Sequence, residues 1–176
     1  MASGVRVGGY PTPMRPLTID YLAGYPDDFR EHARDAKERG DLLPRLEERY
    51  GTPHAIQSNA ALYTYVQDLK REHMRSSPPL GKVRYSEKIS TLHNALGLHT
   101  YAVRVQGNKL KTSNELRVAT VFKDLSEDLL RMVVVHELAH LRHKDHDKAF
   151  YRLCEHMEPD YWRLETDLRL LLYARQ

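Results

Sequence analysis

The sequence predicts an α+β fold in which a small antiparallel sheet packs on a central helix and further helices flank it. Three observations lead to this expectation. Apolar residues recur at helical spacing in residues 59–75. The period changes to two after Gly81, which is typical of strands. A later segment, residues 129–141, is apolar nearly all the way round, which indicates a buried helix.

The N-terminal part divides into an arm and a helical extension. Residues 1–18 contain three prolines and three glycines without periodicity, which predicts a flexible arm. Residues 19–58 form the helical N-terminal extension. Within it, residues 27–39 open with acidic side chains, and a second short helix follows with Pro44 in its first turn. The remaining residues, 59–176, form the main domain.

The middle of the chain supplies the strands. Residues 99–106 alternate apolar and polar side chains, and Gly107-Asn108 after them suits a tight hairpin. Residues 116–122 are a second β-rich run, and residues 83–89 are a weaker candidate. The sheet is therefore expected to be antiparallel.

Three helices are expected after the sheet, over about residues 127–143, 147–157 and 160–174. Ser126, followed by two acidic residues, is a good start for the first of them. This first helix is the apolar one, so it should lie at the centre of the domain.

Composition excludes several classes of protein. No apolar run approaches the ~20 residues of a membrane span, and the N-terminus lacks the hydrophobic region of a secretory signal. Cys154 is the single cysteine, which fits a reducing compartment. We expect a cytoplasmic protein.

Charge is unevenly distributed although the formal net charge is only +3. Residues 61–125, which we call the basic block, carry 11 basic and 5 acidic side chains. Such a block is usually a solvated surface, and it also allows an acidic partner such as nucleic acid.

The chemistry of the chain is concentrated in VVVHELAHLRHKDHDKAF, residues 133–150. His136 and His140 are four residues apart and share one face of a helix, so both imidazoles can bind one tetrahedral zinc ion. Glu137 lies about 100° further round and can reach a water molecule on the metal. Buried imidazoles and a buried carboxylate need such partners, because leaving them unsatisfied costs several kcal/mol.

A catalytic zinc ion needs a third protein ligand, and three residues are candidates. His143 would extend the line of rings along the same helix, and Glu155 would come from the next helix. His146 is the favoured ligand, because Lys-Asp-His breaks the helix and lets it fold back over the first two rings. Asp147 then caps the next helix, and Phe150 packs beneath the site.

These residues carry a resemblance to the YgjP-like metallopeptidase family, relatives of the WLM and SprT-like proteases. The family signature is H-E-x-x-H, a third histidine ten residues after the first, and then an aromatic residue. His136, Glu137, His140 and His146 stand at those positions. The Arg-Trp-Gly-Ser-Cys-like segment common in the family is missing, and Trp162 is the only tryptophan.

The resemblance implies a minimal zincin-like metallopeptidase core and a zinc-dependent peptidase with Glu137 as general base. The substrate is then expected to be a protein or peptide bound as an extended strand at the sheet edge. Tyr151, Tyr161 and His143 are candidates for stabilising the oxyanion. The alternative is a zinc-containing, nucleic-acid-associated or regulatory binding protein with vestigial catalysis.

Overall fold

The computed structural model describes residues 19–87, 102–106 and 109–176. The predicted arm, residues 1–18, lies outside this part of the chain. The described elements follow in the order α1 Asp27–Glu38, α2 Leu42–Tyr50, α3 Asn59–His73, β1 Leu80–Ser86, β2 Ala102–Gln106, β3 Lys109–Ala119, the 3₁₀ helix η1 Thr120–Asp124, α5 Glu127–Ala139, α6 Lys148–Met157 and α7 Tyr161–Arg175. The α+β prediction is confirmed.

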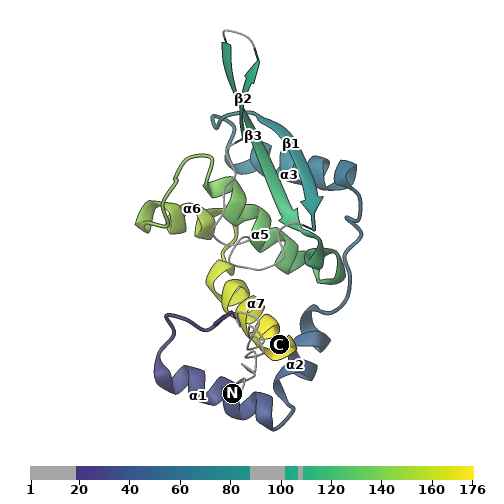
Figure 1. Ribbon diagram of the computed structural model, residues 1–176, viewed down its shortest axis with the longest axis vertical. Coiled ribbons are helices and arrows are strands. Elements are labelled where there is room, and N and C mark those ends of the chain that lie inside the picture. The colour runs from purple at the N-terminus through teal and green to yellow at the C-terminus, as the bar shows by residue number, and fades with distance from the viewer. Residues whose placement is uncertain (1–18, 88–101, 107–108) are drawn as a thin grey trace, which may run out of the picture.

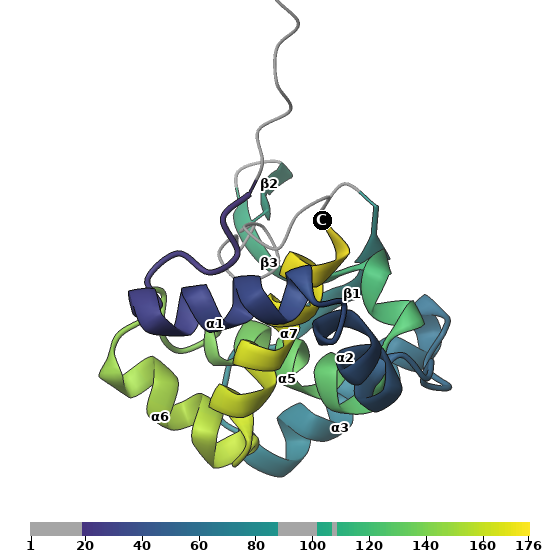
Figure 2. The same cartoon turned by 90° about the horizontal axis from the view of Figure 1, so that it is seen from below.

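Helix α5 is the centre of the molecule, as its apolar sequence predicted. Ten of its thirteen residues are buried, and the helix contacts α3, α6, α7 and β3. Figure 2 shows it enclosed by the other helices. Burial of these side chains is the main stabilising contribution to the fold.

The sheet is mixed, so the prediction of an antiparallel sheet was only half right. Strand β2 is antiparallel to β3, with Gln106 opposite Lys109, but β1 is parallel to β3, with Val83 opposite Leu116. The strand order is β1-β3-β2. The connection between the parallel strands β1 and β3 runs over residues 87–108 and contains β2, which is long enough for the crossover that a parallel pair requires. Figure 1 shows β1 and β3 lying side by side above α5.

Two predicted boundaries were wrong. The strand expected over 116–122 ends at Ala119, and the chain continues as η1. Packing overrides the β propensity of Val121-Phe122, because the tighter helix turns the fully buried Phe122 into the core. The helix expected to reach residue 143 ends at Ala139 and continues as a turn.

The predicted helix starts differ in how they are capped. Ser126 is the N-cap of α5, yet its hydroxyl is buried and has no hydrogen-bond partner among the described residues. Asp147 caps α6 as expected, and its Oδ1 accepts a hydrogen bond from the Phe150 backbone N–H at 2.8 Å.

The N-terminal helices meet the rest of the fold through α7. Helix α2 packs on α7, and Figure 1 shows α1, α2 and α7 gathered at one end of the molecule. Leu46 and Tyr50 of α2 belong to the main hydrophobic core. The division into an extension, 19–58, and a domain, 59–176, stays a prediction. None of the helices in the described ranges is both long and apolar enough to cross a membrane.

Candidate metal centre

The last turn of α5 carries the first two histidines of the motif. His136 and His140 are buried, with ring centroids 5.0 Å apart. They lie on one face because they are one helical turn apart. The apolar residues before them bury the helix, so both imidazoles are fixed inside the protein.

His146 folds back onto this pair. After Ala139 the backbone N–H groups of Leu141 and Arg142 bond to carbonyls three residues earlier, which tightens the helix end into a turn. The loop then brings His146 Nε2 to 3.2 Å from His136 Nε2 and 3.0 Å from His140 Nε2. His146 is exposed, so the cluster has one open side.

The outer nitrogens of the two buried rings are held by other groups. His140 Nδ1 lies 3.0 Å from the carbonyl oxygen of His143, to which it donates. His136 Nδ1 lies 2.7 Å from the Tyr161 hydroxyl oxygen. These contacts fix the ring orientations. The Nε2 atoms of both rings therefore face His146 Nε2.

A second residue supports the Tyr161 contact. The Tyr161 hydroxyl also interacts with the Cys154 thiol through a side-chain hydrogen bond. Burial raises the pKa of Tyr161 and raises the pKa of Cys154 to about 12, so both groups stay protonated.

An aromatic floor closes the cluster from below, as the sequence predicted. The Phe150 ring lies 4.9, 4.6 and 4.7 Å from the ring centroids of His136, His140 and His146. It excludes water from that side of the cluster.

The geometry fits a tetrahedral metal ion. Ligand nitrogens about 2.0–2.1 Å from zinc in a tetrahedral site are separated by about 3.3 Å. The two measured separations, 3.2 and 3.0 Å, are close to this value. Three unprotonated nitrogens at such distances repel one another unless a cation lies between them. The donor set suits zinc, which favours imidazole nitrogen.

Glu137 is buried beside this cluster. Glu137 is only 4% exposed, and burial raises the pKa of its carboxyl group well above the usual range. A carboxylate in such surroundings is a stronger base than an exposed one. It therefore has the character of a proton acceptor for a water molecule near the histidines.

The other candidate residues lie outside the cluster. His143 contributes its backbone carbonyl and not its ring. Glu155 accepts a hydrogen bond from Trp162 Nε1 at 2.8 Å. Tyr161 contacts the side of His136 opposite Nε2, so it cannot reach an oxyanion near the three Nε2 atoms. Tyr151 lies beside His146, with ring centroids 6.2 Å apart.

Sequence reasoning missed the contact that orients His136. Tyr161 entered only as one of three oxyanion candidates, and it lies 25 residues from its partner. The signal that could have found it is its place in the first turn of an apolar helix, where a buried tyrosine needs a polar partner.

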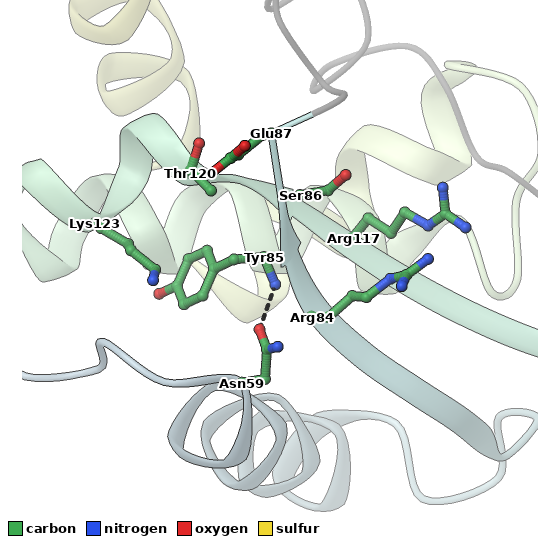
Figure 3. Close-up of a pocket in the computed structure, with 8 residues that line it drawn as sticks. All are labelled: Asn59, Arg84, Tyr85, Ser86, Glu87, Arg117, Thr120 and Lys123. Atoms are coloured by element: carbon green, nitrogen blue, oxygen red, sulfur yellow. Dashed lines mark hydrogen bonds between the residues drawn. The ribbon is translucent and has the colours of Figure 1, made fainter.

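A second region of interest lies where β1 and β3 end. This basic pocket is lined by Asn59, Arg84, Tyr85, Ser86, Glu87, Arg117, Thr120 and Lys123. Figure 3 shows the Arg84 and Arg117 side chains pointing the same way, with Lys123 on the other side of β1. Glu115 pairs with both arginines, at 2.7 Å from Arg84 and 2.9 Å from Arg117. The two arginines therefore converge on a carboxylate of the chain itself, and Lys123 lies apart from them.

Comparison with known proteins places the chain in a family. The family model described as "YgjP-like, metallopeptidase domain" matches residues 52–170 of the sequence. A relative from Escherichia coli (strain K12), named UTP pyrophosphatase, is 51% identical over 154 residues, which cover 88% of this chain and 92% of the relative. No solved structure matches. The chain belongs to the YgjP-like family of metallopeptidase domains.

Proposed function

We propose that this protein is a zinc-dependent hydrolase, with His136, His140 and His146 as metal ligands and Glu137 as the general base. One observation carries the proposal. Three imidazole nitrogens converge at 3.0–3.2 Å beside a buried glutamate, and one side of the cluster is open. A purely structural zinc site has no use for an acid in that place.

The reaction requires a water molecule that loses a proton as it attacks. A bound zinc ion lowers the pKa of its water towards 7 and polarises the oxygen of the substrate. Glu137 takes the proton, and its raised pKa lets it hold that proton during the attack. Tyr161 and the His143 carbonyl keep two of the imidazoles in position meanwhile.

The proposed substrate is a nucleoside triphosphate such as UTP. The relative named UTP pyrophosphatase supports this choice, because half of its residues are identical and the match covers nearly its full length. In the proposed reaction water attacks the α-phosphorus and the bond to the bridging oxygen breaks. The products are the nucleoside monophosphate and diphosphate, and the proton held by Glu137 passes to solvent or to the diphosphate.

A peptide substrate is the second candidate, and the metallopeptidase family model favours it. The sheet also supports it. Within the described residues, β3 pairs with β1 over residues 114–119 on one side and with β2 over residues 109–113 on the other. An extended peptide could add along the remaining edge of β3, and Glu137 would then return its proton to the leaving amine.

One experiment separates the two substrates and tests the base. Wild type and Glu137→Gln, both without a histidine tag, are assayed for diphosphate release from UTP and for cleavage of an unfolded protein. We expect wild type to hydrolyse UTP, and Glu137→Gln to be slower by roughly 10²–10⁴ with its zinc retained. Glu48→Gln, at an exposed position on α2, is the matched control and should behave as wild type.

Two other outcomes would change the proposal. Cleavage of protein that depends on Glu137, without UTP hydrolysis, would establish the peptide reaction. A zinc-loaded protein that hydrolyses neither substrate would favour the binding protein with vestigial catalysis.

A further inference from the structure

Two aromatic side chains continue outward from the exposed histidine of the site. The Tyr151 ring lies 6.2 Å from the His146 ring, and the Trp162 ring lies 4.5 Å from Tyr151 at an interplanar angle of 31°. We call Tyr151 and Trp162 the aromatic ledge. It begins next to His146, the exposed member of the three-histidine cluster.

The indole of Trp162 is open to solvent and held in place. The residue is 45% exposed, and in the described part of the chain Tyr63 is the other large hydrophobic residue so exposed, at 41%. Trp162 Nε1 donates to Glu155 Oε1 at 2.8 Å, which satisfies the one polar atom of the ring and fixes its plane. An aromatic face held in this way is preorganised for stacking.

The ledge joins two helices that are close in sequence. Tyr151 stands in α6 and Trp162 in the first turn of α7, and these helices pack on each other and on α5. Figure 1 shows α6 and α7 meeting beside the end of α5. The same packing that fixes the histidines therefore also fixes the ledge.

We propose that the aromatic ledge stacks the base of the nucleotide substrate, with Trp162 as the residue that contacts the base. This inference rests on the proposed nucleoside triphosphate hydrolysis. A nucleotide places its base one ribose away from the α-phosphorus, and the ledge places a flat, exposed ring three ring contacts away from His136 and His140, by way of His146 and Tyr151. Every base has a π face, so stacking supplies affinity for this part of the ligand.

Fluorescence gives a test that does not depend on turnover. Trp162 is the only tryptophan, so the tryptophan emission of the zinc-loaded protein reports on the ledge alone. UMP should quench this emission in a saturable way, whereas ribose 5-phosphate, which lacks the base, should not. Equal quenching by both ligands, or none by either, would overturn the proposal.

Kinetics give the second arm. Trp162→Leu removes the stacking face at an exposed position and should raise KM for UTP roughly 5- to 150-fold with kcat unchanged, the loss of one base–aromatic stack. Trp162→Phe keeps a π face and should stay within about threefold of wild type, as should the control Tyr63→Leu on α3.

The outcomes distinguish this inference from the proposed function. Normal UTP hydrolysis with an unchanged KM in Trp162→Leu would contradict base stacking by the aromatic ledge. The proposed hydrolase function would be unaffected. Saturable quenching by UMP without UTP hydrolysis would support the base site and remove the proposed reaction. Quenching by a peptide with an aromatic side chain, and not by UMP, would assign the ledge to a peptide.

Discussion

The three-histidine cluster and the basic pocket are both rich in chemically active side chains, yet they are built differently. In the cluster, the two buried rings have a partner on their outer nitrogen and all three present the other nitrogen to a common point. In the basic pocket, Arg84 and Arg117 share the carboxylate of Glu115. The ring nitrogens of the cluster converge on one another, whereas the two arginines bind a carboxylate of the chain itself.

The difference shows that convergence identifies a site better than composition does. The basic block of residues 61–125 has a large excess of positive charge, but its described arginines on β1 and β3 are already paired. His54 makes the same point for histidines. It is buried, and its ring is satisfied by the Phe122 carbonyl and the Ile56 backbone N–H. A buried histidine is a metal ligand only where its lone pair meets others.

Among the predictions that follow from this comparison, removal of the hydroxyl that contacts His136 Nδ1 should have the largest effect. Tyr161→Phe removes the hydroxyl on Nδ1 and leaves the fully buried ring in place. Loss of such a partner typically weakens metal binding by roughly 10- to 100-fold. Zinc affinity measured by chelator competition checks this, with Tyr173→Phe on α7 as the control. An unchanged affinity would mean that Tyr161 does not orient the ring.

His54 should reveal how a buried histidine behaves without a metal. Burial lowers its pKa below 6.5, while the hydrogen bond to the Phe122 carbonyl opposes that shift. Because the folded pKa is lowered, the stability that His54 contributes is present above pH 6.5 and is lost as pH falls through the folded value. His54→Gln should therefore be less stable at pH 7.5, by roughly 1–3 kcal/mol.

Denaturant unfolding of both proteins at pH 7.5 and pH 5 measures this effect. The difference between them should shrink at the lower pH, because only wild type carries the pH-dependent contribution of His54. A difference that stays constant between the two pH values would contradict the account of His54.

Among these predictions, the change in nucleic-acid binding by the basic block should be the smallest effect. We propose that any binding of nucleic acid to residues 61–125 is limited by the pairing of Arg84 and Arg117 with Glu115. Glu115→Gln weakens that pairing and should strengthen binding to a short single-stranded DNA at low salt by at most about fivefold, the upper value of a surface ion pair, although Glu115 itself is mostly buried. Binding should fall steeply as salt rises, because phosphate contacts release counterions.

Titration by fluorescence anisotropy at two salt concentrations checks this expectation, with Glu48→Gln as the control for charge. Wild type and Glu115→Gln that both fail to bind at low salt would assign the basic block to solvation alone.

Much of the fold was predictable because local signals marked it. The bounds of α1, α2 and α6 follow from Gly40, Pro44, Gly51 and Asp147, each of which acts on its own neighbourhood. The direction of β1 was not predictable, since it depends on a long connection and not on the strand itself. The early end of α5 at Ala139 was also not predicted. The turn that follows is the segment that brings His146 back to the first two histidines.

The candidate site divides in the same way. The grouping of His136, His140 and His146 was expected from their spacing and from the helix break between them, and the structure brings their Nε2 atoms together. Tyr161, Tyr151 and Trp162 reach the site only through the packing of α6 and α7 on α5. Contacts of this kind depend on tertiary structure, so no spacing rule could have assigned them.

Metal analysis tests the central claim most directly. Wild type, His136→Ala and His146→Ala are purified without a histidine tag, and their metal content and thermal stability are measured before and after chelation. We predict about one zinc ion per wild-type chain, a lower melting temperature once it is removed, and little zinc in either variant. Wild type that binds no zinc after incubation with it, with a melting temperature that neither zinc nor chelator changes, would contradict the assignment of these three histidines as a metal centre.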